Sequence, residues 1–289
     1  MRKETIKFSI CVALFAGLVG CSKSESVDPA VAAFAKNDTD LTTYVSQSLP
    51  MAKKAPTGFY YVITTTNPAG RTPVAKDVVA FNYTLSTLSG VMLDTLYKSP
   101  KAPYYSGYGV NGLLDGLEQG ITLMREGERA TFLLPSYLAF GNSSNALLPA
   151  YSNVRFDVQL VRTRTEDQLI AEYVTTNKLT ITETTSTGLR FIKTKANPTG
   201  ALPVTGQTAG LNYSGRLLWS STDFDKGVFS LTLGTTSVIK GFEEAVRKLR
   251  EGEKATVIMP SSLGYGVAGS SGIPSSAPLA FDIEVVSVK

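Results

Sequence analysis

Short apolar runs recur along the chain, separated by turns rich in glycine, proline and asparagine. Runs of this kind, with β-branched and aromatic residues and partial period-two alternation, are typical of strands. Many strands with few helices predict an α+β fold in which an antiparallel sheet is wrapped over a helix. The runs that predict strands are 57–63, 78–84, 187–192, 209–215, 229–233, 254–260 and 279–288.

Helical spacing of apolar residues is strongest after Ser237, where it predicts an amphipathic helix of about three turns. Lys248 and Arg250 near the end of this segment suit a helix dipole, and Gly252 suits a left-handed closing residue. A second helix is predicted after Thr165, a residue that favours the N-cap, and a weaker one near residues 38–47. The apolar face of the helix predicted after Ser237 consists of Val238, Phe242, Ala245, Val246 and Leu249.

The chain contains one long phrase twice. MREGERATFLLPSYLAFG, which begins at Met124, returns as LREGEKATVIMPSSLGYG from Leu249. Other landmarks repeat in the same order, such as Thr57-Gly58 against Thr187-Gly188. A period above about 100 residues is too long for a solenoid unit, so we expect a duplicated globular domain. We place the two copies at residues 31–163 and 164–289, each long enough to bury a core.

Residues 1–20 have the pattern of a secretory signal. Basic residues precede an apolar run that is too short to span a bilayer as a mature helix. The run ends in small residues before Cys21, which resembles the lipobox of bacterial lipoproteins. This resemblance implies cleavage before Cys21 and acylation of that residue, with residues 21–30 as a polar tether. An ordinary signal peptide that contains a cysteine is the alternative.

A lipid anchor at Cys21 would hold the protein on a membrane of the cell envelope. Ser22 and Lys23 follow the cysteine, so no aspartate argues for inner-membrane retention under the common lipoprotein rule. We therefore expect outer-membrane attachment facing the periplasm, with surface display as the alternative. The chain has only two cysteines, Cys11 and Cys21, so the mature protein would have neither a free thiol nor a disulfide.

The composition excludes several kinds of chemistry. The chain has no histidine, which removes histidine-based triads, histidine metal sites and imidazole bases. No glycine-rich phosphate loop is present. The net charge is +4, and no basic stripe of the kind that binds nucleic acid occurs. We therefore expect no metal, no cofactor and no nucleic-acid partner.

The second copy carries a series of landmarks that resembles the FKBP-type peptidyl-prolyl isomerases. These landmarks are Tyr213, Phe224-Asp225, Val238-Ile239-Lys240-Gly241-Phe242, Tyr265-Gly266, Gly272-Ile273-Pro274 and Phe281-Asp282. They occur in the family's order and near its spacing over residues 187–289, and again, less closely, over residues 57–163. The resemblance implies two FKBP-like domains, each a bent antiparallel half-barrel around a short helix, with an apolar pocket for a prolyl residue.

By this resemblance, Asp225, Tyr265 and Phe242 would be the catalytic residues. Phe242 would form the floor under the pyrrolidine ring, where the family usually has tryptophan. Asp225 would lie at the pocket edge, and Tyr265 would place a hydroxyl near a substrate carbonyl. Ile239 would offer its backbone N–H, and Ile273 would sit on a flap over the mouth. The substrate-binding residues would be Tyr213, Phe224, Phe229, Val238, Ile239, Ile273 and Phe281. Without the resemblance, these aromatic residues would be taken as core.

The first copy departs from the pattern at its site. The floor position is Leu117, which has no aromatic face, and the hydroxyl position is Phe140. An insertion over residues 98–107 falls beside the expected pocket mouth. We expect this copy to keep the fold with weak or no isomerase activity, and still to bind apolar or proline-containing chains. The residues of this degenerate site would be Tyr83, Leu93, Asp94, Leu114, Leu117, Phe140 and Phe156.

The resemblance implies isomerisation of X–Pro bonds in unfolded or nascent exported polypeptides. Rotation about an amide meets a barrier of roughly 18–20 kcal/mol, and no bond is broken, so no nucleophile is needed. A desolvated pocket that favours the twisted, less polar amide would lower this barrier. Two other hypotheses stay open: a non-catalytic polypeptide-binding module or chaperone, and an envelope protein that reuses the fold as a scaffold for adhesion or assembly.

Overall fold

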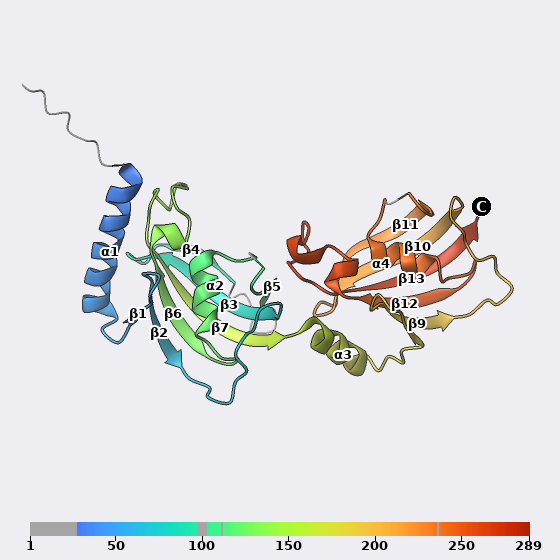
Figure 1. The fold of residues 1–289 in the computed structure, drawn as a ribbon, viewed down its shortest axis with the longest axis horizontal. Coiled ribbons are helices and arrows are strands. Elements are labelled where there is room, and N and C mark those ends of the chain that lie inside the picture. Colours follow the sequence, from blue (N-terminus) through green and yellow to red (C-terminus); the bar gives the residue numbers. More distant parts are fainter. Residues whose placement is uncertain (1–27, 97–102, 111, 236) are drawn as a thin grey trace, which may run out of the picture.

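The computed structural model describes residues 28–96, 103–110, 112–235 and 237–289. The predicted signal peptide, Cys21 and most of the predicted tether lie outside the described residues. The described chain forms two lobes, each built on its own antiparallel sheet with few helices, as Figure 1 shows. The predicted α+β fold is thereby confirmed. Within the described ranges, no helix has both the length and the apolar character that crossing a membrane requires.

The first lobe runs from α1 to β7 and wraps its sheet around α2. Its strands lie in the order β1-β2-β6-β7-β3-β4, and β5 pairs with the other half of β3. The bounds are α1 (Pro29–Ser48), β1 (Lys53–Lys54), β2 (Tyr60–Thr65), β3 (Val78–Thr87), β4 (Met92–Thr95), β5 (Tyr104–Gly107), α2 (Asp115–Thr122), β6 (Arg129–Leu134), the 3-10 helix η1 (Ser136–Leu138) and β7 (Val154–Arg164).

The second lobe repeats this plan from α3 onward. Its strands lie in the order β11-β10-β13-β12-β9-β8, so the last strand of the chain lies inside the sheet. The bounds are α3 (Glu166–Thr176), β8 (Glu183–Thr184), β9 (Arg190–Lys195), β10 (Thr208–Leu217), β11 (Asp223–Thr232), α4 (Lys240–Val246), β12 (Lys254–Met259), the 3-10 helices η2 (Ser261–Leu263) and η3 (Gly266–Ala268), and β13 (Leu279–Val288).

Each lobe has its core between the concave face of the sheet and its short helix. Leu117 and Ile121 of α2 are buried against Phe132 and Phe156 of the first sheet. In the second lobe, α4 contributes Phe242, Ala245 and Val246 to a core that also contains Val257, Phe281 and Ile283. Burial of each large apolar side chain contributes about 1.5–3 kcal/mol, so each cluster stabilises the fold of its own lobe.

Two helices differ in extent from the prediction. α1 begins at Pro29, with Asp28 accepting a hydrogen bond from the Ala30 N–H at 2.8 Å, so the predicted tether is wrong at its last residues. The sequence pattern of α1 is weak because a polar residue, Asn37, lies at a buried position. α4 begins at Lys240 rather than after Ser237, because its N-cap residue, Ile239, still has extended backbone (ψ 147°).

The leading helices of the two lobes dock in the same way. In the first lobe, the Asn37 Oδ1 accepts hydrogen bonds from the N–H and the Oγ of Ser136, at 2.8 and 2.6 Å. In the second, the Glu166 carboxylate accepts them from the N–H and the Oγ of Ser261, at 2.6 and 2.7 Å. The duplicated unit therefore includes the helix that precedes the sheet.

The repeated Arg-Glu-Gly-Glu phrase is a turn built around a buried carboxylate. In the second lobe, Glu253 accepts hydrogen bonds from the backbone N–H of Arg250 at 2.9 Å and of Asn197 at 3.2 Å, and Lys193 Nζ lies 2.9 Å away. Burial opposes ionisation of Glu253, but these hydrogen bonds and the Lys193 charge hold its pKa below the usual value. Gly252 has φ +80°, the left-handed conformation expected from the sequence.

The first lobe contains the same turn. Glu128 accepts from the N–H of Arg125 at 2.8 Å and of Asn67 at 2.9 Å. Gly70 of the neighbouring turn packs so closely that a Cβ there would lie 2.3 Å from the Glu126 carbonyl oxygen. In both lobes this carboxylate joins the end of the helix, the start of a central strand and a distant turn.

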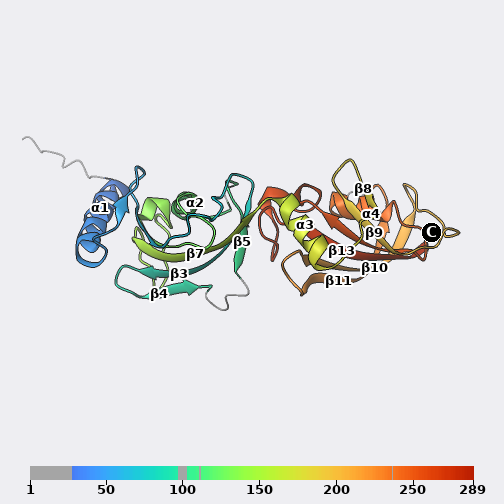
Figure 2. The same ribbon diagram turned by 90° about the horizontal axis from the view of Figure 1, so that it is seen from below.

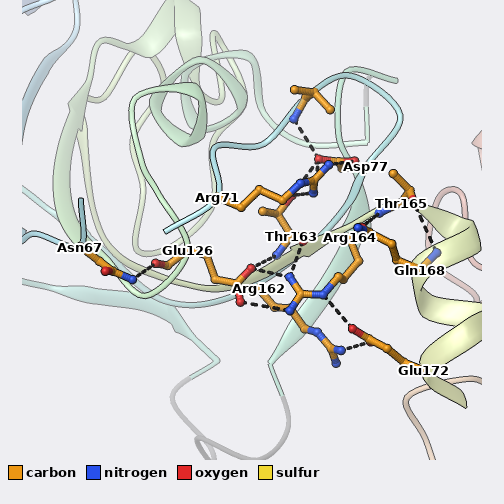
Figure 3. A network of polar contacts seen from close by, with 11 residues as sticks. Asn67, Arg71, Asp77, Glu126, Arg162, Thr163, Arg164, Thr165, Gln168 and Glu172 are labelled. Atoms are coloured by element: carbon orange, nitrogen blue, oxygen red, sulfur yellow. Dashed lines mark hydrogen bonds and ion pairs between the residues drawn. The ribbon is translucent and has the colours of Figure 1, made fainter. Parts of the chain in front are cut away.

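Charged side chains fix the segment that connects the two lobes, as Figure 3 shows. Arg164, the last residue of β7, lies 2.6 Å from Glu126 of the first lobe and 2.8 Å from Glu172 of α3. Arg162 pairs with the same Glu172. Thr165 and Gln168 then form a capping box that starts α3. The connection is therefore fixed on both sides.

We expect the Glu253→Gln substitution to lower the free energy of unfolding of the second lobe by about 2–3 kcal/mol at neutral pH, because a buried, multiply hydrogen-bonded carboxylate is lost. A carboxyl whose pKa is lowered by folding stabilises above its unfolded pKa of about 4.3, and this contribution disappears as pH falls through the folded value. Urea unfolding at pH 7 and pH 3 should thus show a difference that shrinks in acid.

The matched control is Glu183→Gln. Glu183 forms a half-exposed pair with Lys248, and such pairs contribute about 0–1 kcal/mol. Equal losses in the two variants would contradict the central role of the buried turn.

Candidate functional site

The second lobe has a hollow of about 450 Å³ at the open end of its half-barrel. The concave face of the sheet, the segment before α4, α4 itself and the start of the 265–278 loop all contribute to its walls. The hollow is lined by Tyr213, Asp225, Phe229, Ser237, Val238, Ile239, Phe242, Tyr265 and Phe281.

Phe242 forms the floor of this hollow and is 4% exposed. Two rings stand edge-on to it: Tyr213 with ring centroids 5.7 Å apart and Phe281 at 5.4 Å. Edge-to-face pairs of this kind each contribute about 0.5–1.5 kcal/mol beyond area burial, so the floor is rigid. The pocket therefore offers an aromatic face to a small apolar ring.

Gly215 on β10 makes room for this aromatic cluster. A Cβ at Gly215 would lie 2.4 Å from the Phe281 ring and 2.9 Å from the Phe224 ring. These two rings are themselves edge-to-face, with centroids 5.7 Å apart. The absence of a side chain at Gly215 thus leaves room for both rings, Phe281 in the pocket wall and Phe224 against it.

Polar side chains also line the hollow. The Tyr213 hydroxyl donates a hydrogen bond to the Asp225 carboxylate at 2.9 Å, which orients that carboxylate at the rim. Burial raises the pKa of Tyr213, and the hydrogen bond and charge of Asp225 raise it further. Tyr265 is 37% exposed and also lines the hollow. The site therefore combines an apolar floor with an oriented acid and a second phenol.

Two residues predicted for the pocket are not among its lining residues. Ile273 is 6% exposed and packs in the core of the second lobe with Phe242 and Phe281, so its place on a flap over the pocket mouth stays a prediction. Phe224 supports Phe281 from behind and is not among the lining residues. Ser237 lines the hollow and was missed, because nothing in its residue type separates it from an ordinary loop serine.

The first lobe has a smaller hollow of about 280 Å³. Of the residues predicted for its degenerate site, Leu93, Asp94 and Phe140 line it. The others pack in the core beneath: Tyr83, Leu114, Leu117 and Phe156. The remaining walls come largely from the loop after Phe140, namely Ser143, Ser144, Asn145, Leu147 and Leu148.

The first site keeps its acid but not its floor. The Tyr83 hydroxyl donates to Asp94 at 2.6 Å, and burial, followed by this hydrogen bond, raises the pKa of Tyr83. Leu117 is 4% exposed at the floor position, so the aromatic face is absent there. Tyr104 pairs with Phe81 as Phe229 pairs with Leu211, which makes Tyr104 the register equivalent of Phe229. The sequence did not reveal this equivalence, because Tyr104 lies within the insertion.

Neither hollow has the residues of a metal centre. No group of three or more acidic, cysteine or histidine side chains in the described part of the chain could hold a metal ion. The larger hollow presents an apolar floor together with the hydrogen-bonding side chains of Asp225 and Tyr265.

Comparison with known proteins follows the same division of the chain. The family model described as "FKBP-type peptidyl-prolyl cis-trans isomerase" matches residues 69–161 and 200–286. Peptidyl-prolyl cis-trans isomerase FKBP10 of mouse is 28% identical over 219 residues, 75% of this chain and 35% of that protein. Isomerase FKBP53 of Arabidopsis thaliana is 37% identical over 97 residues, 32% of this chain and 20% of that protein.

Solved structures were compared as well. The crystal structure of the three FKBP domains of wheat FKBP73 has a TM-score of 0.35 at 20% identity, covering 81% of this chain and 96% of that one. The chain spans about a third of the length of the mouse relative.

We expect the phenol of Tyr213 to ionise above the ordinary tyrosine pKa of about 10, because burial and Asp225 both favour its neutral form. The absorbance change at alkaline pH, taken as the difference between the wild-type chain and Tyr213→Phe, should have its midpoint above that value. The Asp225→Asn variant should move this midpoint downward, and an unmoved midpoint would contradict the coupling.

Proposed function

The chain belongs to the FKBP-type peptidyl-prolyl cis-trans isomerase family, and we propose that its second lobe catalyses rotation about X–Pro bonds of exported polypeptides in the larger hollow. One observation carries this proposal. An aromatic floor, Phe242, an oriented carboxylate, Asp225, and a phenol, Tyr265, face the same apolar space. The first lobe lacks two of these three features.

The proposed mechanism rests on the physics of the amide bond. An X–Pro bond isomerises unaided in tens to hundreds of seconds, because resonance holds the amide planar. In the twisted state the carbonyl oxygen carries less charge and the nitrogen is more amine-like. Transfer into an apolar pocket penalises the planar, more polar form more strongly. About 4 kcal/mol of such differential binding accelerates rotation about a thousandfold.

Each pocket residue has a role in this scheme. The Phe242 face holds the pyrrolidine ring, and the rings of Tyr213 and Phe281 fix that face in place. Tyr265 donates a hydrogen bond to a substrate carbonyl, which orients the chain on one side of the twisting bond. Asp225, held by Tyr213, lies at the rim beside the carbonyl that rotates. None of these steps transfers a proton, so the lack of histidine is compatible with them.

The first lobe favours a second role, that of a polypeptide-binding module. It keeps the Tyr83–Asp94 pair and an apolar hollow, but has Leu117 and Phe140 where the second lobe has Phe242 and Tyr265. A site of this kind can hold an apolar side chain without stabilising a twisted amide. We propose that it contributes binding of unfolded chains with weak or no isomerisation.

The proposed location is the cell envelope. The signal-like residues 1–20 and the lipobox-like sequence before Cys21 support a lipid anchor, and outer-membrane attachment facing the periplasm fits the residues that follow. No nucleic-acid partner is proposed.

A matched pair of substitutions tests the assignment of catalysis to the second lobe. In the full chain, Asp225→Leu should lower kcat/KM for a Leu-Pro tetrapeptide by about tenfold or more in a protease-coupled assay, since a charged hydrogen-bonding group contributes about 1.5–3 kcal/mol. The same change in the first lobe, Asp94→Leu, should leave kcat/KM unchanged. Equal losses would show that both lobes catalyse, and a wild-type chain without activity would refute the isomerase proposal.

The Tyr265→Phe substitution tests the role of the hydroxyl. It reproduces the residue type of the first lobe and should reduce kcat/KM about fivefold, the effect of one hydrogen bond of about 1 kcal/mol. Suppression of aggregation of an unfolded client should change little, because the apolar lining remains. If both activities fall together, binding and catalysis share one site.

The Cys21→Ser substitution tests the anchor. We expect the wild-type protein in the membrane fraction of the producing bacterium and the variant in the soluble envelope fraction, because acylation requires the cysteine. Equal partition of the two proteins would contradict the lipoprotein proposal.

A further inference from the structure

The strand β5 (Tyr104–Gly107), within the described part of the insertion, contacts the second lobe. It pairs with β3, and successive side chains of a strand point to opposite faces. Tyr104 turns to its own lobe, where its ring stands edge-on to Phe81 at 5.5 Å. Tyr105 turns the other way. Figure 2 shows β5 at the end of the first lobe beside the loops of the second.

The first contact across the lobes is aromatic. The rings of Tyr105 and Trp219 are stacked, with centroids 4.1 Å apart and planes 9° from parallel. Trp219 lies in the turn between β10 and β11, and β11 continues directly to Phe224 and Asp225. The stack therefore holds the hairpin that carries the carboxylate of the larger hollow.

The second contact is a backbone hydrogen bond to the loop that begins with Tyr265 of that hollow. The Gly107 N–H donates to the Ser275 carbonyl at 2.9 Å. Within the loop, the Ser275 Oγ donates to the Val267 carbonyl at 2.6 Å, and the Ser276 N–H donates to the Gly266 carbonyl at 3.0 Å. Gly266 follows Tyr265 directly, so three hydrogen bonds link the first lobe to the residue beside the pocket phenol.

The fit at this contact is close. A Cβ at Gly107 would lie 2.6 Å from the Ser276 Oγ and 2.8 Å from the Ser276 Cβ. Ser276 itself is 3% exposed and has φ +56°, a left-handed backbone that costs a non-glycine residue energy unless its surroundings hold it. The first lobe provides part of those surroundings.

β5 thus contacts two segments that lead to the hollow, through Trp219 and Ser275, which are not themselves among its lining residues. The turn with Trp219 continues along β11 to Asp225, and the loop with Ser275 begins at Tyr265. Between the lobes, Arg162 and Arg164 pair with Glu172, as Figure 3 shows, and fix the connecting segment.

We propose that β5 of the first lobe is a positioning element for the site of the second. Tyr105 holds the 217–223 turn and Gly107 holds the 265–278 loop, so that Asp225 and Tyr265 both face the substrate. This inference rests on the proposed function of that site. It gives the first lobe a role in isomerisation that does not require a working pocket of its own.

The test uses the full-length chain and two readouts. Tyr105→Ala removes the stack, and Gly107→Val pushes against Ser276. Hydrogen exchange of the 264–278 peptide should become about tenfold faster in either variant, because its backbone loses an external support. The kcat/KM for the Leu-Pro tetrapeptide should fall about fivefold, the effect of losing one aromatic pair. Exchange of the α4 peptide should stay unchanged, which separates loosening of the loop from unfolding of the lobe.

Two further variants serve as controls. Tyr105→Phe keeps the stack and should retain both wild-type values. Tyr137→Ala removes a ring of the first lobe that lies against Phe34, away from β5, and should change neither readout.

Unchanged exchange of the 264–278 peptide in both Tyr105→Ala and Gly107→Val would overturn the proposal, whatever the activity. Faster exchange with unchanged kcat/KM in an active chain would overturn it as well, because the loop would then move without effect on the site. If the wild-type chain has no activity, the proposed function fails, and exchange together with fluorescence-labelled tetrapeptide binding still decides the positioning role: faster exchange with weaker binding supports it, and unchanged binding overturns it.

Discussion

Each lobe depends on one buried carboxylate. Glu253, and Glu128 in the first lobe, collects backbone N–H groups from a helix end and from a distant turn, and so fixes where the helix stops and the central strand begins. The position of α4 relative to the sheet follows from that turn, and with it the position of Phe242. The pocket floor is therefore set by a polar contact that lies outside the pocket. The longest repeated phrase of the chain begins with this shared turn and ends at Phe140 and Tyr265, where the two sites differ.

The difference between the two sites arises on this shared frame. Both lobes place a tyrosine–aspartate pair on neighbouring strands, at 2.6 and 2.9 Å. In the second lobe, three edge-to-face aromatic pairs join Tyr213, Phe242, Phe281 and Phe224 into one cluster that forms the floor and wall of the hollow. In the first, Leu117 fills the floor, and the hollow is displaced toward the loop that carries Leu147 and Leu148. The shared frame and the aspartate give both lobes a hollow with an acid at its rim. The aromatic rings give the second lobe, in addition, a surface that recognises a planar ring.

Much of this could be predicted from the sequence, because strand periodicity and ordered landmarks are local signals. The α+β fold and the residues that gather at the larger hollow belong to this class. The extent of α1 could not be predicted, since Asn37 is buried only through partners about a hundred residues away in the chain. The burial of Ile273 could not be predicted either, because an apolar residue in a loop can turn inward or outward, and only packing decides. The role of residues 98–107 was also hidden: an insertion shows extra length, but the direction of Tyr105 depends on the register of β5 with β3 and on the orientation of the lobes.

The stack between Tyr105 and Trp219 has one more consequence. Trp219 is the only tryptophan of the chain. Its indole lies at the junction of the lobes, in contact with a residue from each side of that junction. The intrinsic tryptophan emission of the whole protein therefore originates from a single point, and that point changes its surroundings whenever the lobes separate. The molecule carries an optical reporter of its own domain contact without any label.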